Sequence, residues 1–341
     1  MSLQPLAIGG TQIPPDSRQT VEVPLPLLYT HTPVVLAVQV LRGRRDGPRL
    51  FLSGAIHGDE INGAEIIRRV LRCPALRKLR GTLIAVPVVN VYGFVRQSRY
   101  LPDRRDLNRC FPGSETGSLA ARLANAFLRE IVGKASHGID LHTGAVHREN
   151  LPQIRGAFDA GGQIEDLARA FGAPVILNSE MRDGSLREAA AALGVPVLVY
   201  EGGEALRFNE SAIHAGVQGV LAVMRRLGMI PGSRHLLAQR REAVVAQSTS
   251  WVRAPQSGVL RELIPLGSSV RKNDPLGLIS DPYGENETPV LAPSPGIVIG
   301  RVNLPLVNEG EALYHLARVG NEDIQDIQME PDPTNLAPGF I

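Results

Sequence analysis

The sequence predicts an α/β protein with a mixed sheet covered by helices on both faces, followed by a small β-barrel or sandwich. Strand-like apolar runs alternate with segments of helical periodicity from about residue 49 to residue 227. The run Thr82–Val89 is almost continuously apolar, as expected of a strand that is buried on both faces. Helical periodicity stops near residue 245, where short runs rich in Val, Leu, Gly and Pro begin. We therefore divide the chain into an α/β domain over residues 1–244, a β domain over 245–320 and an irregular tail over 321–341.

The first part of the α/β domain contains three expected strands, Thr20–Leu25, Val34–Leu41 and Arg49–Ser53. The stretch Arg42–Gly47 carries two glycines and several charged residues, which predicts a hairpin turn between the last two strands. Apolar residues then recur at helical spacing over Ile61–Cys73, which predicts a helix that begins near residue 60.

Strands and helices alternate over the remainder of this domain. Such alternation favours a mostly parallel or mixed sheet, in which ligand sites lie beyond the carboxyl ends of the strands. The expected helices are Ser118–Val132, Ile164–Phe171, Leu186–Leu193 and Ala212–Leu227, and the expected strands are Thr82–Val89, Gly138–His142, Gln153–Ala157, Pro174–Leu177 and Val195–Tyr200.

The β domain contains a weak internal repeat. Residues Arg253–Leu260 match Leu291–Val298, and Val270–Ile279 align with Val307–Leu316. Two such halves look like a biotinyl/lipoyl carrier domain, which presents a modifiable lysine between its halves. The corresponding segment Asp281–Pro289 contains no lysine, so we expect no swinging-arm cofactor.

Composition excludes several classes of protein. A hydrophobic content of 43% with 21% charged residues excludes bulk disorder, and a net charge of +2 is too small to indicate nucleic acid or an acidic membrane as the main partner. Arginine outnumbers lysine 33 to 3, a bias that a genomic preference would also produce. The two cysteines form no disulfide framework, and Met1–Pro15 lacks the pattern of a signal peptide. No apolar segment approaches the about 20 residues that span a bilayer, and we expect a cytoplasmic protein.

The segment Ser53–Glu60 contains the first candidate site residues, His57 and Glu60. They follow the expected strand Arg49–Ser53 and precede the helix, so they lie on the loop or first helical turn that leaves a strand end. An imidazole and a carboxylate three residues apart on such a turn can face one metal ion. The pair alone is a weak signal, because a His-x-x-Glu pair occurs easily by chance.

A third ligand is available in the motif Asp140-Leu141-His142. The expected strand ends at His142, which places its imidazole at the same sheet edge as His57 and Glu60. Asp140 lies two residues earlier on the same face of the strand, where it can orient a ligand. The alternative for a lone histidine at a strand end is a hydrogen-bonded residue without a metal.

The strand Val195–Tyr200 is followed by Glu201 and two glycines. A carboxylate at the end of a buried strand costs stability unless it has a partner, and glycines allow a ligand to approach closely. Near a metal, Glu201 can take a proton from a water whose pKa is lowered to about 7. The alternative is a buried glutamate paired with one of the many arginines.

A long connection after residue 89 supplies Arg99, Asn108 and Arg109. Two guanidinium groups and an amide can bind a carboxylate and stabilise an oxyanion. The stretch is rich in arginine overall, so composition does not decide which arginine acts, and a solvated basic loop is the alternative reading.

Together these motifs resemble the succinylglutamate desuccinylase/aspartoacylase family, which is related to the zinc carboxypeptidases. The resemblance covers about residues 45–230, and members commonly carry a small β domain as well. The correct order of the motifs makes the resemblance far more specific than any one of them. The motifs are His57-x-x-Glu60, Arg99-Tyr100, Asp106-Leu107-Asn108-Arg109, Asp140-Leu141-His142 and the strand-end Glu201.

The resemblance implies a carboxypeptidase-like α/β fold and a zinc-dependent amide hydrolase that removes the acyl group from a small N-acyl amino acid. Residues 1–244 would form the deacylase domain, with one zinc per chain held by His57, Glu60 and His142. The resemblance further implies that Glu201 is the general base and proton donor and that Arg99 polarises the scissile carbonyl. Asn108 and Arg109 would bind the substrate carboxylate, with Arg187 as a further candidate and Arg182 as its alternative.

Two other functions fit the same residues. A carboxypeptidase acting on peptides uses similar metal and arginine motifs, and a non-catalytic binding protein can retain the fold. The acyl group, the amino acid and the number of subunits stay open, although base rates for soluble enzymes favour a homo-oligomer. The β domain is attached next to the expected site, where we expect it to narrow the entrance and favour small substrates.

Overall fold

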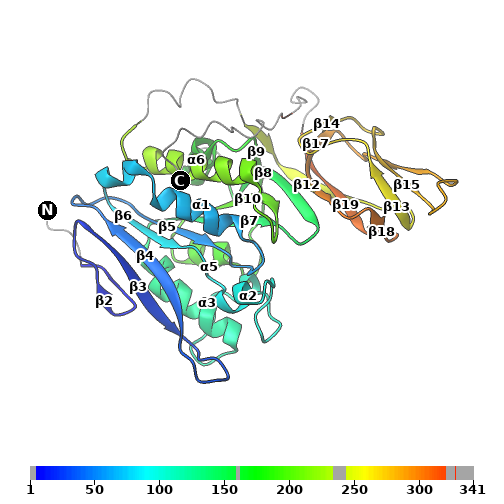
Figure 1. The fold of residues 1–341 in the computed structure, drawn as a ribbon. Helices are drawn as coiled ribbons and strands as arrows, with labels where there is room; N and C mark the ends of the chain where they lie inside the picture. Colours follow the sequence, from blue (N-terminus) through cyan, green and yellow to red (C-terminus); the bar gives the residue numbers. More distant parts are fainter. Residues whose placement is uncertain (1–4, 159–161, 233–242, 320–326, 328–341) are drawn as a thin grey trace.

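A mixed sheet of thirteen strands forms the centre of the described chain and extends into its C-terminal part, beside a separate sheet of four strands and another of two (Figure 1). The structure is a computed structural model that describes residues 5–158, 162–232, 243–319 and residue 327. The main path of the sheet is β12-β19-β17-β8-β10-β7-β5-β6-β4-β3, with β9, β11 and β14 attached beside it. The strands of its N-terminal part are β3 (Ser17–Leu25), β4 (Val34–Arg42), β5 (Arg49–Gly54), β6 (Thr82–Val86), β7 (His137–Gly144), β8 (Arg148–Gly156), β9 (Val175–Asn178) and β10 (Val197–Glu204).

Helices cover both faces of this sheet. Helices α1 (Asn62–Leu71), α4 (Gln163–Phe171) and α6 (Glu210–Arg226) pack on one face in one hydrophobic cluster. Helices α2 (Val91–Val95), α3 (Leu119–Glu130) and α5 (Leu186–Ala192) pack on the other face in a second cluster. Figure 1 shows α1 and α6 on the opposite side of the sheet from α3 and α5. The predicted α/β architecture with a mixed, doubly covered sheet is confirmed.

The continuous apolar runs follow directly from this double coverage. In β6, Leu83 and Ala85 belong to one cluster while Ile84 and Val86 belong to the other, because successive side chains point to opposite faces of a strand. Every residue of β6 is buried. A strand in this position has no solvated face, and its sequence therefore shows no polar alternation.

The predicted hairpin between β4 and β5 is wrong. Strand β4 pairs with β3 over nine residues and with β6, whereas β5 lies between β6 and β7. The connection Arg42–Gly47 is instead bound to the segment before β6. The backbone N–H of Gly43 donates a hydrogen bond to the carbonyl of Gly81, and the N–H of Gly81 donates one to the carbonyl of Arg45. Strand β6, which comes later in the sequence, therefore lies beside β4, where the predicted hairpin would have placed β5.

The remaining elements of this part are short. Three 3-10 helices span Pro74–Lys78, Leu107–Arg109 and Val132–Lys134, and β1 (Ala7–Ile8) pairs with β2 (Thr11–Gln12).

The ends of two strands differ from the predicted ends. Strand β6 stops at Val86, before the predicted end at Val89, and β10 continues beyond Tyr200 through Glu201 to Glu204.

The C-terminal strands gather at one end of the sheet (Figure 1). The two repeat halves pair equivalently: β13 with β15 and β18 in one half, β17 with β19 and β14 in the other. Each half pairs one short strand with the other half: β14 of the first half pairs with β17, and β18 of the second half pairs with β13. This equivalence supports the internal repeat, while the likeness to a carrier domain stays a prediction. The strands are β11 (Val244–Ala246), β12 (Ser248–Arg253), β13 (Gly258–Glu262), β14 (Ser269–Val270), β15 (Pro275–Ser280), β16 (Thr288–Leu291), β17 (Gly296–Val302), β18 (Leu306–Val307) and β19 (Ala312–Arg318).

Two strands join the C-terminal part to the main sheet. Strand β11 pairs with β9, and β17 pairs with β8 through Gly300 opposite Asn150. The boundary at residue 244 therefore falls within a strand of the main sheet, and the division into domains stays a prediction. The expected tail 321–341 lies outside the described residues apart from Ile327. Within the described chain, no helix combines the length and apolar character needed to cross a bilayer.

Candidate active site

The loop between β5 and α1 carries the first two candidate ligands. Ala55 takes a left-handed backbone conformation (φ 48°) where the loop leaves the strand. Gly58, the residue directly after His57, fixes the path of the loop, because a Cβ there would lie 2.0 Å from the carbonyl carbon of Gly93. Glycine at this position allows the loop to pack on α2 and directs His57 and Glu60 to one side.

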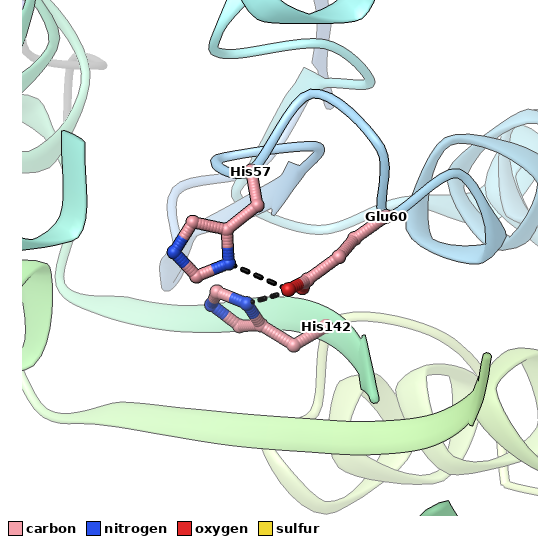
Figure 2. A group of neighbouring side chains, drawn as sticks. All are labelled: His57, Glu60 and His142. Atoms are coloured by element: carbon pink, nitrogen blue, oxygen red, sulfur yellow. Dashed lines mark hydrogen bonds and ion pairs between the residues drawn. The ribbon is translucent and has the colours of Figure 1, made fainter. Parts of the chain in front are cut away.

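Figure 2 shows His57, Glu60 and His142 converging at the carboxyl ends of β5 and β7. The Nδ1 atom of His57 lies 2.6 Å from Oε1 of Glu60, and Nδ1 of His142 lies 2.8 Å from Oε2. The candidate ligand atoms all lie within 4.8 Å of one another. The three side chains are buried, with Glu60 only 2% exposed. Parallel pairing of β5 with β7 places these distant residues at the same sheet edge.

The outward nitrogen of each imidazole contacts a carboxylate. Nε2 of His142 lies 2.7 Å from Asp140, which also accepts a hydrogen bond from the hydroxyl of Ser53. Nε2 of His57 lies 3.1 Å from Asp106. Carboxylates in these positions fix the ring orientation and leave both Nδ1 atoms directed at the centre of the cluster.

Asp140→Asn is expected to weaken metal binding by about 10- to 100-fold, the usual cost of losing a carboxylate behind a histidine ligand. The exchange preserves the size of the side chain while it removes the charge beside His142. Competition of each protein with a chelating dye measures the effect. Asp166→Asn, at an exposed carboxylate on α4, is the matched control. Equal metal affinity of the Asp140 variant and the parent would contradict the role.

The electrostatics of the cluster are dominated by its carboxylates. Burial alone would raise the pKa of Glu60, but the adjacent charges of His57 and His142 hold it well below its ordinary value. Burial disfavours a charge on His142, yet Asp140 and Glu60 together raise its pKa well above the usual value. Burial disfavours the protonated form of His57, but the adjacent carboxylates of Glu60 and Asp106 outweigh this effect and raise its pKa as well. The cluster thus attracts positive charge strongly.

This chemistry fits a divalent metal ion. Two imidazole nitrogens and one carboxylate oxygen are the donors of a catalytic zinc site, which keeps one position for a water or substrate. Three carboxylates, Glu60, Asp106 and Asp140, surround the two imidazoles. The surplus of negative charge is what a divalent cation neutralises. The residues His57, Glu60 and His142 are therefore suited to hold such an ion.

Glu201 lies on β10 directly beside His142 of β7. Its Oε2 atom accepts a hydrogen bond of 2.9 Å from the amide of Asn150 on β8. Its Oε1 atom lies 3.9 Å from Nε of Arg155, a separation that is longer than a hydrogen bond. The carboxylate is thus hydrogen-bonded at one oxygen, and Glu201 lines the cavity that contains the ligand cluster.

Asn150→Ala is expected to lower kcat about tenfold with a smaller change in KM, because Glu201 loses a hydrogen bond worth about 1.5 kcal/mol or more. Steady-state kinetics of the variant and the parent measure the changes in kcat and in KM separately. Asn303→Ala is the matched control, since Asn303 makes the same amide contact of 2.9 Å with Glu204 on the same strand. A change confined to KM, or an equal loss in the control, would show that Asn150 does not position Glu201.

Arg99 extends from the connection after α2 into the cluster. Its guanidinium donates two hydrogen bonds to Asp106, of 2.9 and 3.2 Å, and a third of 3.3 Å to Glu60. Burial disfavours its charge, but Glu60 and Asp106 raise its pKa above the ordinary value. A permanently charged donor therefore points at the same space as the three candidate ligands.

The candidate substrate contacts line the same cavity of about 770 Å³. The amide oxygen of Asn108 accepts a hydrogen bond from the backbone of Leu186, and Arg109 is exposed beside it. Arg187 on α5 and Arg182 in the preceding loop also line the cavity. All residues expected at the site thus surround one cavity, and none of them lies elsewhere.

Several lining residues were not expected from the sequence. Asn150 and Arg155 reach Glu201 only because β8 pairs antiparallel with β10, a register that no local motif indicates. Trp251 and His315 come from the C-terminal strands and stack with ring centroids 4.4 Å apart. The sole signal for Asp106 was its place in the segment Asp106–Arg109. The weak repeat after residue 245 gave no indication of which side chains face the cavity.

A family match covers the part of the chain that builds the cluster. The sequence profile described as "Succinylglutamate desuccinylase/Aspartoacylase catalytic domain" matches residues 46–227. This range includes both histidines, Glu60 and Glu201, together with every arginine of the cavity. It ends before the C-terminal strands begin.

Individual relatives extend the similarity beyond that range. A Halomonas elongata protein named N-alpha-acetyl-L-2,4-diaminobutyric acid deacetylase is 24% identical over 304 residues, which are 84% of this chain and 86% of the relative. A Rhodobacter sphaeroides structure named succinylglutamatedesuccinylase/aspartoacylase superposes with a TM-score of 0.78 at 26% identity, covering 89% of this chain and 97% of its own. The product-bound ectoine utilization protein of Ruegeria pomeroyi gives a TM-score of 0.77 at 24% identity, covering 88% and 94%, a likeness in fold. The C-terminal strands are thus part of a chain arrangement that is found in these proteins.

Proposed function

The chain belongs to the succinylglutamate desuccinylase/aspartoacylase family, and on that basis we propose that it is a zinc-dependent hydrolase that deacylates small N-acyl amino acids. The observation that carries the proposal is the convergence of His57, Glu60 and His142 within 4.8 Å in a cavity that also contains Glu201. The name of the Halomonas elongata relative, a deacetylase of an N-acetyl amino acid, supports the reaction class. We infer zinc from the donor set, because two imidazole nitrogens and one carboxylate oxygen are ligands of catalytic zinc sites.

One zinc ion per chain would be held by His57, Glu60 and His142. When bound, zinc supplies a Lewis acid that lowers the pKa of water to about 7 and polarises a carbonyl oxygen. Asp106 and Asp140 keep the two imidazoles in position from behind, since each contacts the nitrogen that faces away from the cluster.

Glu201 moves the proton in this mechanism. Its carboxylate takes a proton from the attacking water and delivers it to the nitrogen of the leaving amino acid. Asn150 holds one carboxylate oxygen at 2.9 Å, and the other oxygen, 3.9 Å from Arg155, accepts the proton. Because Glu201 neighbours His142 across the β7–β10 pair, the base and one of the metal ligands are held on adjacent strands of the sheet.

Arginines and an amide bind the anionic groups. Arg99 lies among the ligands and donates to the oxygen of the scissile carbonyl as it acquires charge. Asn108 and Arg109 bind the substrate carboxylate, because an amide donor and a guanidinium fork suit its two oxygens. Arg187 contributes positive charge from α5, where it lines the same cavity.

The cavity favours a small substrate. Its volume of about 770 Å³ lies in the range of small-molecule sites, about 300–1,000 Å³. Gln247, Thr249, Trp251 and His315 form part of its wall, so the C-terminal strands limit the space above the ligands. We assign the β domain over residues 245–320 this narrowing role, on the α/β domain of residues 1–244.

Assays of the zinc-loaded protein with N-acetyl and N-succinyl amino acids beside short peptides test the function. We expect release of the free amino acid from the acylated compounds and little cleavage of peptides. Cleavage of peptides alone would instead support a carboxypeptidase. Tight metal binding with no turnover of any compound would support a non-catalytic binding protein.

A further inference from the structure

A second hollow, of about 910 Å³, lies at the edge of the sheet opposite to the active site. The β4–β5 connection, the 3-10 helix Pro74–Lys78 and the segment before β6 border it, where Arg49 of β5 pairs with Thr82 of β6 at the start of both strands. The candidate metal ligands instead lie beyond or near the carboxyl ends of β5 and β7. The six residues of β5 span roughly 20 Å, and no described residue lines both cavities. The two sites are therefore separate.

The backbone around this hollow is held in one arrangement. Gly43 and Gly81 are joined by the hydrogen bonds described above, and a Cβ on Gly43 would lie 2.1 Å from the carbonyl oxygen of Leu79. Gly81 takes a left-handed conformation (φ 82°), and a Cβ there would lie 2.1 Å from the carbonyl oxygen of Pro48. Glycine at both positions permits this close packing of two segments. The walls are thus in place before a ligand arrives, which lowers the cost of binding one.

Basic side chains dominate the lining of the hollow. Seven arginines and one lysine line it, against a single acidic lining residue, Asp16, in the described chain. The whole chain has a net charge of only +2. Positive charge is therefore concentrated at this place rather than spread evenly over the surface, and such a concentration attracts anions.

Few of these charges are paired with a carboxylate. Arg44 contacts Asp16 at 2.8 Å, and among the described residues none of the other exposed cations of the hollow has a carboxylate within 4.0 Å. Arg45 and Arg77 are both exposed, and in the described part of the chain their side chains make no hydrogen bond. They lie on different segments, the β4–β5 connection and the 3-10 helix, so that donors reach the hollow from more than one wall.

Backbone carbonyl groups hold two further guanidinium groups in place without neutralising them. Arg18 donates a hydrogen bond of 3.1 Å to the carbonyl of Leu71, and Arg80 donates one of 2.8 Å to the carbonyl of Asp46. Arg42 is a buried member of the lining, only 6% exposed, and burial lowers its pKa. An anion in the hollow would stabilise the charged form of this side chain.

We propose that this hollow is a second ligand site, which binds a polyphosphate group such as that of inorganic pyrophosphate or of a nucleoside triphosphate. Guanidinium forks match phosphate oxygens, and a polyphosphate carries several negative charges to meet several cations, whereas a single carboxylate carries one. The volume of the hollow lies within the usual range of small-molecule sites, about 300–1,000 Å³. The proposal does not depend on the deacylase function, and either can fail without the other.

A small anion fits the hollow better than a nucleic acid or an acidic membrane does. Those partners require an extended cationic face, because they present phosphates over a long or flat surface. Here the cations converge on one concave region, and the small net charge of the chain gives no wider cationic face. We therefore make the two macromolecular partners outcomes of the test.

Calorimetric titration of the zinc-loaded protein with inorganic phosphate, inorganic pyrophosphate and adenosine triphosphate tests the site. We expect saturable one-to-one binding of pyrophosphate, at least about tenfold tighter than that of phosphate, because the second phosphate accepts further charge-assisted hydrogen bonds. Binding should weaken as salt rises, since the screening length falls from about 30 Å at 0.01 M to about 8 Å at 0.15 M. Tighter binding of the triphosphate would identify a nucleotide, and equal binding a polyphosphate alone. No saturable binding, or equal affinity for phosphate and pyrophosphate, would overturn the proposal.

The double variant Arg45→Gln/Arg77→Gln assigns the binding to the hollow. It should bind pyrophosphate at least about tenfold more weakly than the parent. The matched control is Arg271→Gln/Arg318→Gln, which removes the same charge from exposed positions that line neither cavity. Heat from any chelation of zinc by pyrophosphate is common to all these proteins and cancels in the comparison. Thermal unfolding without the anion shows whether each variant is folded, and an equal loss of affinity in both double variants would contradict a specific site.

Arg187→Gln separates this hollow from the active-site cavity, which Arg187 lines. Pyrophosphate affinity should be unchanged in this variant. If affinity fell here and survived in Arg45→Gln/Arg77→Gln, the anion would bind in the active site and the proposal would be wrong. A short DNA duplex and phosphatidylserine vesicles complete the test. Binding of either one that is lost in the Arg45→Gln/Arg77→Gln protein, without binding of pyrophosphate, would replace the small anion by a macromolecular partner. None of these measurements uses turnover, so their outcome leaves the deacylase function to its own assay.

Discussion

Glu201→Gln is expected to lower kcat by about 10²–10⁴-fold while the protein retains its metal, because an amide cannot accept the proton of the attacking water. Glutamine has the size of glutamate and keeps an oxygen that can accept the 2.9 Å hydrogen bond from Asn150. The substitution thus removes the base without opening a cavity. Steady-state kinetics and metal analysis of the purified protein measure the two quantities.

The matched control is Glu204→Gln on the same strand. Glu204 contacts the backbone of His147 and the amide of Asn303, and it does not line the cavity. It should therefore keep most of the activity. If Glu201→Gln lost its metal, Glu201 would be a ligand rather than the base, and unchanged turnover would remove it from the mechanism altogether.

The order of the motifs was sufficient to predict the family, which the match over residues 46–227 confirms. The physical reason lies in the sheet. His57 and Glu60 follow β5, and His142 and Glu201 lie near the carboxyl ends of β7 and β10; the carboxyl ends of neighbouring parallel strands meet at one edge. The apolar runs indicate the strands and the edge at which these side chains lie, while the order β5-β7-β10, which brings them together, is seen only in the structure.

Residues that reach the site across antiparallel pairs could not be predicted. Asn150 and Arg155 lie on β8, whose pairing with β10 contains a register shift between Glu201 and Gly203. A shift of one residue would turn both side chains to the other face of the sheet. No feature of the local sequence determines this register, since it depends on β17 packing against β8 as well.

The error in the strand order has a similar origin. Adjacent strands in sequence often pair, and a glycine-containing turn strengthened that expectation for β4 and β5. In the structure β4 completes a nine-residue ladder with β3, and β6 is inserted between β4 and β5. The insertion depends on contacts between segments about forty residues apart, such as Gly43 with Gly81, which periodicity does not reveal.

His142→Ala is expected to abolish metal binding and activity together. The change leaves two ligands, His57 and Glu60, whereas a catalytic zinc site uses three protein ligands. We expect a loss of affinity beyond the about 10- to 100-fold predicted for Asp140→Asn, since the ligand itself is removed rather than its support. Metal content after gel filtration and a chelator competition measure the effect.

The control for this change is His137→Ala at the start of the same strand, β7. His137 contacts Ser136 and Gln163 outside the cavity, so its removal tests whether the loss of any histidine from the strand disturbs the fold. Retention of metal by this variant, with loss in His142→Ala, would assign the effect to the ligand. Stoichiometric metal of undiminished affinity in His142→Ala would instead separate His142 from the metal centre. In that case the close contact of two imidazoles with one buried glutamate would have to be explained as a structural hydrogen-bond network.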